Sequence, residues 1–317
     1  MSALRELKSW LCTRIIGQET LIDRLLIALL ADGNLLVEGA PGLAKTKAIK
    51  TLAEGLEGDF HRIQFTPDLL PGDITGTDIY RPETGSFQFQ HGPIFHNLVL
   101  ADEINRAPAK VQSALLEAMG ERQISVGQTT YRLPALFLVM ATQNPIEQEG
   151  TYPLPEAQLD RFLMHVRVDY PDADAERQIL QLARREAHGN ESAPRPQPVS
   201  QADVFAARAE VLALHMAPAV EEYIVQLVIA TRRPAPYDRE LAGWIEFGAS
   251  PRATIALDRC ARAHAWLAGR DYVSPDDVRE VLPDVLRHRL LLSFDAEAGG
   301  IDTGRVIDRL VELVAVA

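Results

Sequence analysis

A glycine-rich segment near the start of the chain carries the residue types that bind phosphate. It follows a short apolar run, Leu35 to Val37, and precedes a helical pattern that begins at about Thr46. Glycines let the backbone turn its N–H groups toward phosphate oxygens, and the start of a helix adds partial positive charge. At this spacing a lysine reaches the β and γ oxygens, and a threonine hydroxyl ligates Mg²⁺. We therefore expect an ATP- and Mg²⁺-binding loop made of Gly39, Ala40, Pro41, Gly42, Leu43, Ala44, Lys45 and Thr46.

One position of this loop departs from the usual pattern. This chain has Ala44 where the strict phosphate-loop pattern has glycine. An alanine fits there only if its φ angle stays negative, because its Cβ atom disfavours the left-handed region. A chance glycine-rich loop is the alternative interpretation. The apolar strand before the loop and the helix after it make that alternative the weaker one.

Two carboxylates follow a second apolar run in the sequence. Asp102 and Glu103 come directly after Leu98 to Ala101, a run that is typical of a buried parallel strand. Ligands of open α/β sheets bind at the carboxyl ends of the strands. We expect Asp102 to hold the metal ion together with Thr46, and Glu103 to polarise the attacking water. The alternative is a strand-end turn with two solvated carboxylates.

Three further side chains are candidates for contact with the phosphates or the water. Asn144 follows another apolar run at a place from which an amide reaches the γ-phosphate, although an asparagine before proline also forms ordinary turns. Arg161 stands at a predicted helix end, where a cation already favours the helix dipole. Arg252 lies in the first turn of a helix predicted after Ser250, where its charge opposes the dipole by about 0.3–1 kcal/mol. A bound phosphate would offset that cost, so we expect a functional role for Arg252.

Composition limits the partners and the compartment of the protein. The formal net charge is −12 and no run of Lys and Arg supplies a basic patch, so nucleic acid is a disfavoured partner. Two cysteines, Cys12 and Cys260, make no disulfide framework, which fits a reducing compartment. No apolar stretch approaches the roughly 20 residues that span a bilayer. The N-terminus is charged and lacks the apolar core of a signal peptide. We therefore expect a cytoplasmic protein with no membrane span.

The order of apolar runs predicts an α/β domain with a parallel sheet. The strand candidates are residues 35–37, 60–65, 98–101, 136–141 and 162–168. Helices are expected at about residues 18–31, 46–56 and 111–119. Turn-rich sequence at residues 79–89 and 123–133 predicts two β-hairpins inserted between the strands. Plain surface hairpins would give the same pattern.

A proline-rich segment predicts the domain boundary. Residues 189–200 contain three prolines without apolar periodicity, as expected of a linker. The α/β domain would then span residues 1–188 and a second domain residues 201–317. Beyond the linker the apolar spacing is helical, at residues 220–230, 251–268 and 275–292. We expect the second domain to be small and all-α.

In order along nearly the whole chain, these motifs resemble those of AAA+ ATPases, and among them the MoxR family. The resemblance rests on the phosphate loop and on the segments Ile63–Asp73, Gly92–Phe95, Ala101–Pro108, Ala141–Pro145, Pro153–Phe162 and Ser250–Ala253. It implies a P-loop AAA+ core with a five-stranded parallel sheet and β-hairpin inserts, followed by an all-α lid domain. Alanine at position 44 is an accepted variant in this family.

The resemblance also implies roles that the residues alone leave open. Asn144 is similar to the sensor that positions water, Arg161 to the arginine finger that reaches a neighbouring subunit's ATP, and Arg252 to the lid sensor on the γ-phosphate. Gly17 and Gln18 resemble the segment that packs on adenine, and the hairpins resemble inserts that face the pore of a ring. A finger supplied by a neighbour requires an oligomer, so the resemblance implies a hexameric ring. Members of the family commonly work with a partner that contains a von Willebrand factor A domain.

Three hypotheses about function follow. The leading one is an ATP-hydrolysing, chaperone-like factor that remodels or matures protein complexes, with metal insertion as one form of that work. No motif identifies the client protein. A DNA-acting AAA+ motor is the first alternative, and the net charge argues against it. A nucleotide-gated binding scaffold with negligible turnover is the second, and the presence of Glu103 argues against it.

Overall fold

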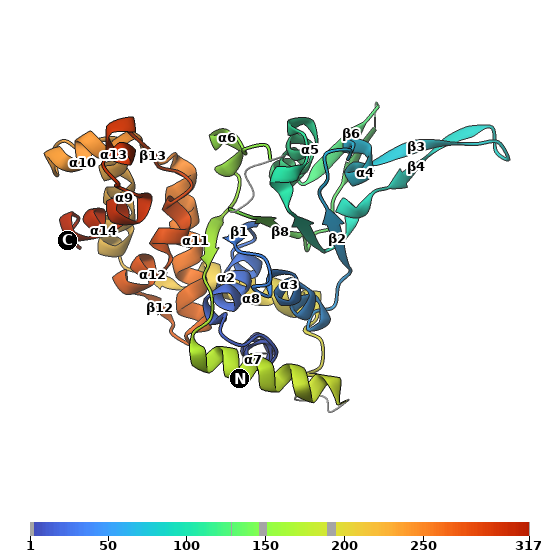
Figure 1. Cartoon of the computed structure of the whole chain (residues 1–317), viewed down its shortest axis with the longest axis horizontal. Helices are drawn as coiled ribbons and strands as arrows, with labels where there is room; N and C mark the ends of the chain where they lie inside the picture. The colour runs from blue at the N-terminus through green and yellow to red at the C-terminus, as the bar shows by residue number, and fades with distance from the viewer. Residues whose placement is uncertain (1–2, 128, 146–150, 189–194, 317) are drawn as a thin grey trace. The chain divides into compact units, whose positions relative to one another are not determined.

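A five-stranded sheet organises the first part of the chain in the computed structural model, which describes residues 3–127, 129–145, 151–188 and 195–316. The strand order is β2-β5-β8-β1-β9, and Figure 1 labels β2, β8 and β1 of this sheet. The pairs β2–β5, β5–β8 and β8–β1 are parallel. All five strand predictions are confirmed, with shifted ends. The bounds are β1 Leu35–Gly39, β2 Phe60–Gln64, β5 Leu98–Asp102, β8 Leu138–Gln143 and β9 Met164–Val168.

The central strands β5 and β8 are apolar along almost their whole length because both faces of the sheet are covered. The helix α2 presents an almost completely buried run to this core, and α3 packs against β5. The three predicted helices are confirmed as α2, α3 and α5. The helices of this part are α1 Ala3–Arg14, α2 Glu19–Leu30, α3 Lys45–Glu54, α4 Pro71–Thr75, α5 Ala109–Glu121, α6 Glu156–Leu159 and α7 Ala173–Ala187, with 3₁₀ turns η1 Pro93–Phe95 and η2 Ile104–Arg106.

Both predicted hairpins are present and antiparallel. The first pairs β3 (Gly76–Arg81) with β4 (Ser86–His91) and projects away from the five-stranded sheet (Figure 1). The second pairs β6 (Gln123–Val126) with β7 (Thr129–Arg132). Gln128, which falls between these two strands in the sequence, lies outside the described residues. The two hairpins are in contact. The ring of Phe89 on β4 stacks on that of Tyr131 on β7, with the ring centroids 4.0 Å apart.

The first hairpin is joined to α4 where the backbone leaves no room for a side chain. At Gly76, with φ +94°, a Cβ atom would lie 2.2 Å from the carbonyl oxygen of Gln90. At Gly92 it would lie 2.3 Å from the carbonyl oxygen of Ile74. Only glycine fits such close backbone approach, so the hairpin leaves the domain at a fixed point.

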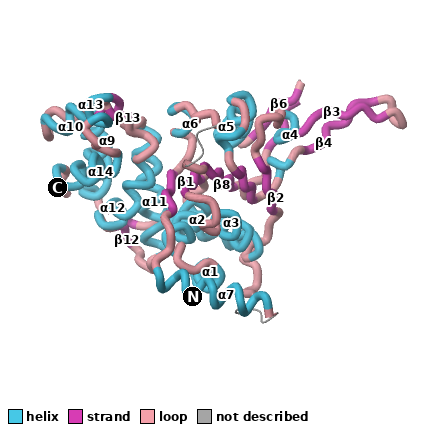
Figure 2. Tube along the Cα trace, in the orientation of Figure 1, coloured by secondary structure: helices cyan, strands magenta, loops and turns pink. Residues whose placement is uncertain are grey.

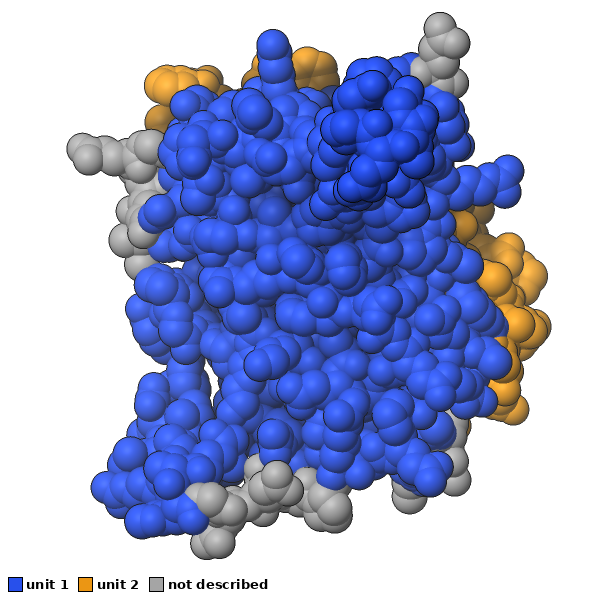
Figure 3. Space-filling view, turned by 90° about the vertical axis from the view of Figure 1, so that its right-hand side faces the viewer, with its two compact units in different colours: residues 1–161, 166–205 blue, residues 162–165, 206–317 orange. Residues whose placement is uncertain are grey.

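The chain divides into two units, which Figure 3 colours separately. Unit 1 comprises residues 1–161 and 166–205, and unit 2 comprises residues 162–165 and 206–317. This division falls inside α8 (Gln201–Ala213), which the sequence analysis assigned wholly to the second domain. Of the expected linker at 189–200, residues 189–194 lie outside the described residues, and Val199 forms a β-bridge with Leu56. The domain boundaries at 188 and 201 stay a prediction.

Unit 2 is mainly helical, as Figure 2 shows. Two short strand pairs accompany its helices: β10 (His215–Met216) is parallel to β12 (Tyr272–Val273), and β11 (Ile245–Phe247) is antiparallel to β13 (Leu291–Leu292). These strand pairs are not predicted from the sequence, which indicates an all-α domain here. The helices are α9 Pro218–Arg232, α10 Arg239–Trp244, α11 Pro251–Leu267, α12 Pro275–Leu286, α13 Phe294–Ala298 and α14 Thr303–Leu313. Among the described residues of the whole chain, no helix combines the length and apolar character needed to cross a membrane.

Candidate active site

The glycine-rich loop connects the end of β1 to the start of α3, as the sequence predicts. At Gly39 a Cβ atom would lie 2.7 Å from the carbonyl oxygen of Val168, so the loop begins against the backbone of β9. Gly42 has φ +85°. The expectation of a negative φ at Ala44 is wrong: its φ is +56° and its ψ is +14°, in the left-handed region. The chain must reverse there to enter α3. Glycine adopts this conformation most readily, and alanine has the next smallest side chain.

Lys45 extends back over this loop. Its Nζ donates a hydrogen bond of 2.6 Å to the carbonyl oxygen of Gly39. Burial lowers the pKa of Lys45 below its ordinary value, although the carboxylates of Asp102 and Glu103 act in the opposite direction. The ammonium group is therefore partly desolvated and close to negative charge. A phosphate placed in the loop would find a cation that water screens less than it would on an open surface.

A cavity of about 310 Å³ brings most of the predicted site residues together. It lies within unit 1. Residues from the loop, from β5 and from the end of β8 line it, namely Pro41, Gly42, Leu43, Ala44, Lys45, Thr46, Lys47, Asp102, Glu103, Thr142 and Asn144. Carboxylate, hydroxyl and ammonium groups thus face one space. The cavity has the composition expected of a site for a phosphorylated ligand with a hard cation.

A second cavity of about 280 Å³ shares the loop residues Pro41 to Ala44 with the first. Its apolar lining includes Ile16 and Leu182, and the buried side chain of Gln18 also lines it. The Nε2 of Gln18 donates a hydrogen bond of 3.1 Å to the carbonyl oxygen of Asp169. Gly17 does not line this cavity: its φ is +74°, and a Cβ atom there would lie 2.9 Å from the side chain of Ala175. Gly17 lies in the turn that precedes Gln18.

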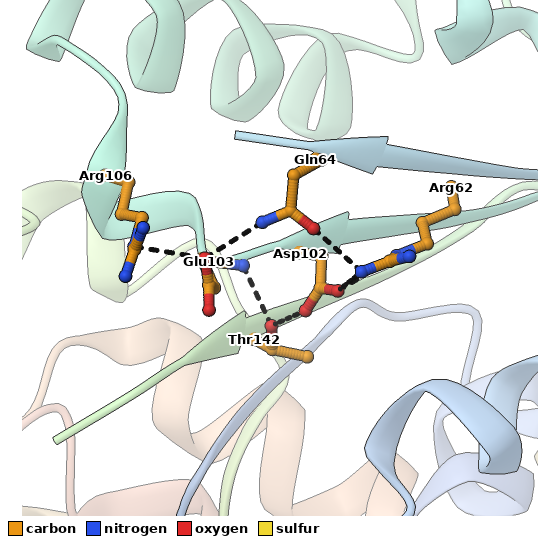
Figure 4. A network of polar contacts seen from close by, with 6 residues as sticks. All are labelled: Arg62, Gln64, Asp102, Glu103, Arg106 and Thr142. Atoms are coloured by element: carbon orange, nitrogen blue, oxygen red, sulfur yellow. Dashed lines mark hydrogen bonds and ion pairs between the residues drawn. The ribbon is translucent and has the colours of Figure 1, made fainter. Parts of the chain in front are cut away.

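The Asp102 carboxylate is held from two sides (Figure 4). Its Oδ1 accepts a hydrogen bond of 2.5 Å from the hydroxyl of Thr142 on β8. Its Oδ2 accepts two hydrogen bonds from Arg62 on β2, at 3.0 Å from Nε and 2.7 Å from Nη2. Neither Arg62 nor Thr142 is among the site residues predicted from the sequence. Both lie on strands that flank β5, so the sheet order supplies a contact that no local motif reveals.

Glu103 lies at the end of β5 in a constrained backbone conformation. Its φ is +57° and its ψ is +52°, and its backbone N–H donates to the Thr142 hydroxyl at 2.9 Å. Its Oε2 accepts a hydrogen bond of 2.9 Å from Gln64 Nε2 and forms an ion pair of 3.0 Å with Arg106 Nε. Figure 4 shows these contacts as one continuous network with Arg62 and Asp102. The left-handed backbone turns the carboxylate out of the strand line.

The remaining predicted residues lie at different places. Asn144 is buried and lines the phosphate cavity next to Thr142. Arg161 follows α6, and its Nη1 donates a hydrogen bond of 2.8 Å to the carbonyl oxygen of Leu116 on α5. Arg252 belongs to unit 2, in the first turn of α11, and its backbone N–H donates to the Ser250 hydroxyl at 3.2 Å. Ser250 is therefore the N-cap that the sequence predicts.

Comparisons with known proteins agree with this arrangement. The family described as "ATPase family associated with various cellular activities (AAA)" matches residues 34–164, and the AAA lid domain matches residues 242–310. The chain is 49% identical to "Chaperone MoxR1" of Mycobacterium tuberculosis, over 95% of this chain and 79% of that protein. It is 35% identical to "Protein MoxR" of Methylorubrum extorquens, over 88% and 84% of the two chains. A crystal structure of a Cytophaga hutchinsonii protein, provisionally described as an ATPase, is 48% identical with a TM-score of 0.91, covering 99% of this chain and 95% of that one.

Proposed function

The chain belongs to the MoxR family of AAA+ ATPases, and from this premise we propose that it hydrolyses ATP to remodel or mature other proteins. One observation carries the proposal: a single cavity is lined by Lys45, Thr46, Asp102, Glu103 and Asn144. Phosphate binding, metal binding and water activation need these side-chain types in one place. The likeness to a protein named as a chaperone supports the remodelling role.

The residues present fit Mg²⁺ as the metal. The side chains of Thr46 and Asp102 supply hydroxyl and carboxylate oxygens, which this cation prefers, and both line the phosphate cavity. A metal bound there with the nucleotide would neutralise charge on the β- and γ-phosphates. Lys45 would add a second positive charge on the same phosphates.

Glu103 is the general base of the proposal. Its carboxylate would orient a water molecule and accept its proton as the water attacks the γ-phosphorus. Asn144, buried at the rim of the same cavity, would hold that water through its amide. The cavity beside the loop, with Gln18, would take the adenine base.

Two arginines complete the proposed site. We assign Arg161 as a finger that acts on the ATP of a neighbouring subunit, and Arg252 as a lid residue that contacts the γ-phosphate. Guanidinium groups stabilise the charge that spreads over the phosphate oxygens in the transition state. A finger that acts in trans requires a ring, and we propose a hexamer.

The work of this ring would be done on a client protein in the cytoplasm, with a partner that contains a von Willebrand factor A domain. The projecting β3–β4 hairpin supports a role in client contact, because Tyr80 and Phe87 near its tip are 52% and 72% exposed. Exposed aromatic side chains of this kind are typical of protein contact surfaces. Metal insertion remains one proposed form of the maturation reaction.

The experiment that tests the proposed chemistry is Glu103→Gln, measured by phosphate release and by ATP binding. The amide keeps the shape of the side chain but does not accept a proton, so ATP binding is retained while turnover falls by about 10²-fold or more. Lys45→Ala is expected to lose ATP affinity instead. Glu57→Gln, at an exposed carboxylate, is the matched control and keeps the wild-type rate. Wild-type turnover in Glu103→Gln would refute the assigned base.

A further inference from the structure

The ion pair between Arg62 and Asp102 has a consequence for metal binding that depends on the proposed function. We propose that Arg62 is an internal counter-ion that keeps Asp102 from binding a divalent cation until ATP is present. The metal then enters the site only together with the nucleotide. Arg62 is a positioning residue in this proposal, because it acts through Asp102 and not on the phosphates.

The hydrogen bonds from Arg62 and Thr142 occupy most of the acceptor directions of the Asp102 carboxylate. A carboxylate oxygen has two lone-pair directions, and Oδ2 of Asp102 already accepts both Nε and Nη2 of Arg62. Oδ1 accepts the short hydrogen bond from Thr142. Only one acceptor direction, on Oδ1, therefore remains for a cation or for the water molecules that the cation carries. A divalent ion gains its full set of contacts at Asp102 only when Arg62 withdraws.

The positive charge of Arg62 repels a divalent cation at Asp102. A guanidinium bonded directly to the ligand carboxylate places a full positive charge within a few ångströms of the metal position. Repulsion between a monovalent and a divalent cation at such a distance is substantial even in a partly solvated site. The Arg106 charge beside Glu103 and the Lys45 ammonium, which is close to both Asp102 and Glu103, act in the same direction. Without a bound polyanion, the site therefore opposes free Mg²⁺.

Arg62 has to leave Asp102 when ATP binds, and its exposure to solvent permits this. The side chain of Arg62 is 49% exposed and that of Asp102 is 12% exposed, so the arginine is the partner that is open to solvent. Ion pairs with one exposed partner contribute little net stability. The phosphates of ATP bring several negative charges, which attract the metal and offer a guanidinium other oxygens to bind. ATP thereby exchanges one cation for another at Asp102.

An ordinary surface ion pair is the competing interpretation of the same contact. Under that interpretation Arg62 orders the end of β2, and its loss leaves the metal affinity of the nucleotide-free protein unchanged. The two interpretations differ in the metal affinity that they predict for the nucleotide-free protein, and not in the rate of ATP hydrolysis. The decisive measurement is therefore made without ATP.

The test titrates the full-length protein with Mn²⁺, which replaces Mg²⁺ and is read by electron paramagnetic resonance. We expect Arg62→Gln to bind Mn²⁺ without nucleotide at least about tenfold more tightly than the wild type, because a charge in contact with the ligand is removed. Adding Asp102→Asn to this variant should abolish the gain. With ATP bound, the difference between Arg62→Gln and the wild type should shrink.

Arg106→Gln is the matched control, because it removes the same charge from the neighbouring carboxylate and leaves Arg62 in place. Its Mn²⁺ affinity should rise less than that of Arg62→Gln. Equal gains in the two variants, or no gain in Arg62→Gln, would overturn the proposal. Arg62→Lys keeps the charge without the two-pronged contact and should lie between the wild type and Arg62→Gln. Absence of ATP turnover in the wild type would refute the proposed function and would leave this titration interpretable.

Discussion

Two residues at the phosphate cavity share an uncommon backbone conformation. Ala44 and Glu103 both have φ near +57°, a region that costs a residue with a Cβ atom of order 1–3 kcal/mol. Ala44 starts α3 and Glu103 ends β5, so both lie where the chain changes direction beside the cavity. The fold tolerates this strain at the two points from which the phosphate loop and the candidate base are presented. Asp32 and Arg122 have the same left-handed backbone outside the cavity, so the conformation is not confined to the site.

Ala44→Gly tests this strain directly. Glycine adopts the left-handed region without penalty but gains freedom in the unfolded chain, so we expect the free energy of unfolding to rise by up to about 1 kcal/mol. Urea denaturation measures the change. The same substitution at Ala48, inside α3 and buried, should lower the free energy of unfolding by about 1 kcal/mol or more. Destabilisation by Ala44→Gly would show that the loop leaves alanine unstrained.

At the scale of elements, the end of α12 is bound to the segment that leads into β9. His288 and Arg289 follow α12, and His288 Nε2 lies 3.2 Å from the carbonyl oxygen of Phe162. Arg289 donates to the same carbonyl at 2.6 Å and to that of Leu163 at 3.2 Å. All of these residues belong to unit 2. Since a carbonyl only accepts hydrogen bonds, His288 carries its proton on Nε2, and its buried Nδ1 has no hydrogen-bond partner among the described residues.

This contact predicts a pH dependence of stability. Burial, followed by the charges of Arg289 and His165, holds the pKa of His288 well below its ordinary value of 6.5. Below about pH 6.5 the unfolded chain takes up a proton that the folded chain does not, so the contribution is complete above that pH and is lost as the pH falls. The free energy of unfolding should decrease by up to about 1.4 kcal/mol per pH unit from this site.

In the variant His288→Gln, the glutamine keeps a donor for the Phe162 carbonyl and does not titrate. The free energy of unfolding of this variant should therefore vary less than that of the wild type between about pH 7 and 5, the range in which histidine titrates. Urea denaturation at a series of pH values makes the comparison. His215→Gln, at an exposed histidine, is the control and should follow the wild type. Parallel pH profiles for wild type and His288→Gln would contradict the assignment.

At the scale of the whole molecule, the proposed ring depends on a side chain that its own subunit holds in place. Arg161 donates to the Leu116 carbonyl, and a Cβ atom at Gly120 would lie 2.7 Å from its Nη1. The glycine on α5 therefore makes room for the guanidinium. A finger fixed in this way loses little side-chain freedom when it meets a phosphate.

Mixed rings test whether the site is shared. Arg161→Ala alone should bind ATP and fail to hydrolyse it, and so should Glu103→Gln. When the two variants are mixed, some interfaces combine an intact base with an intact finger, about a quarter of them at equal ratio in a randomly mixed ring. We expect partial recovery of phosphate release with a maximum near that ratio. Arg233→Ala, at an exposed arginine of unit 2, is the control and should keep wild-type turnover. No recovery at any ratio would count against a site completed by a neighbour.

The sequence by itself determined the features whose chemistry is local. Residues Gly39 to Thr46 and the pair Asp102–Glu103 are read directly, because phosphate and metal binding require fixed residue types at fixed spacing. The five strands and the two hairpins follow from runs of apolar residues and from turn sequences, which report burial and chain reversal over a few positions. The strands and hairpins were predicted with errors only at their ends.

Only the tertiary structure decided which side chains from other strands reach the carboxylates. Arg62 and Gln64 meet Asp102 and Glu103 because β2 lies beside β5 in register, and Thr142 meets them because β8 lies on the other side. The left-handed backbone at Ala44 is likewise imposed by the fold against the preference of the residue. The short strand pairs of unit 2 are too brief to leave a periodic signal. Pairing across a sheet and backbone strain depend on residues far apart in the chain, and for that reason a local pattern does not encode them.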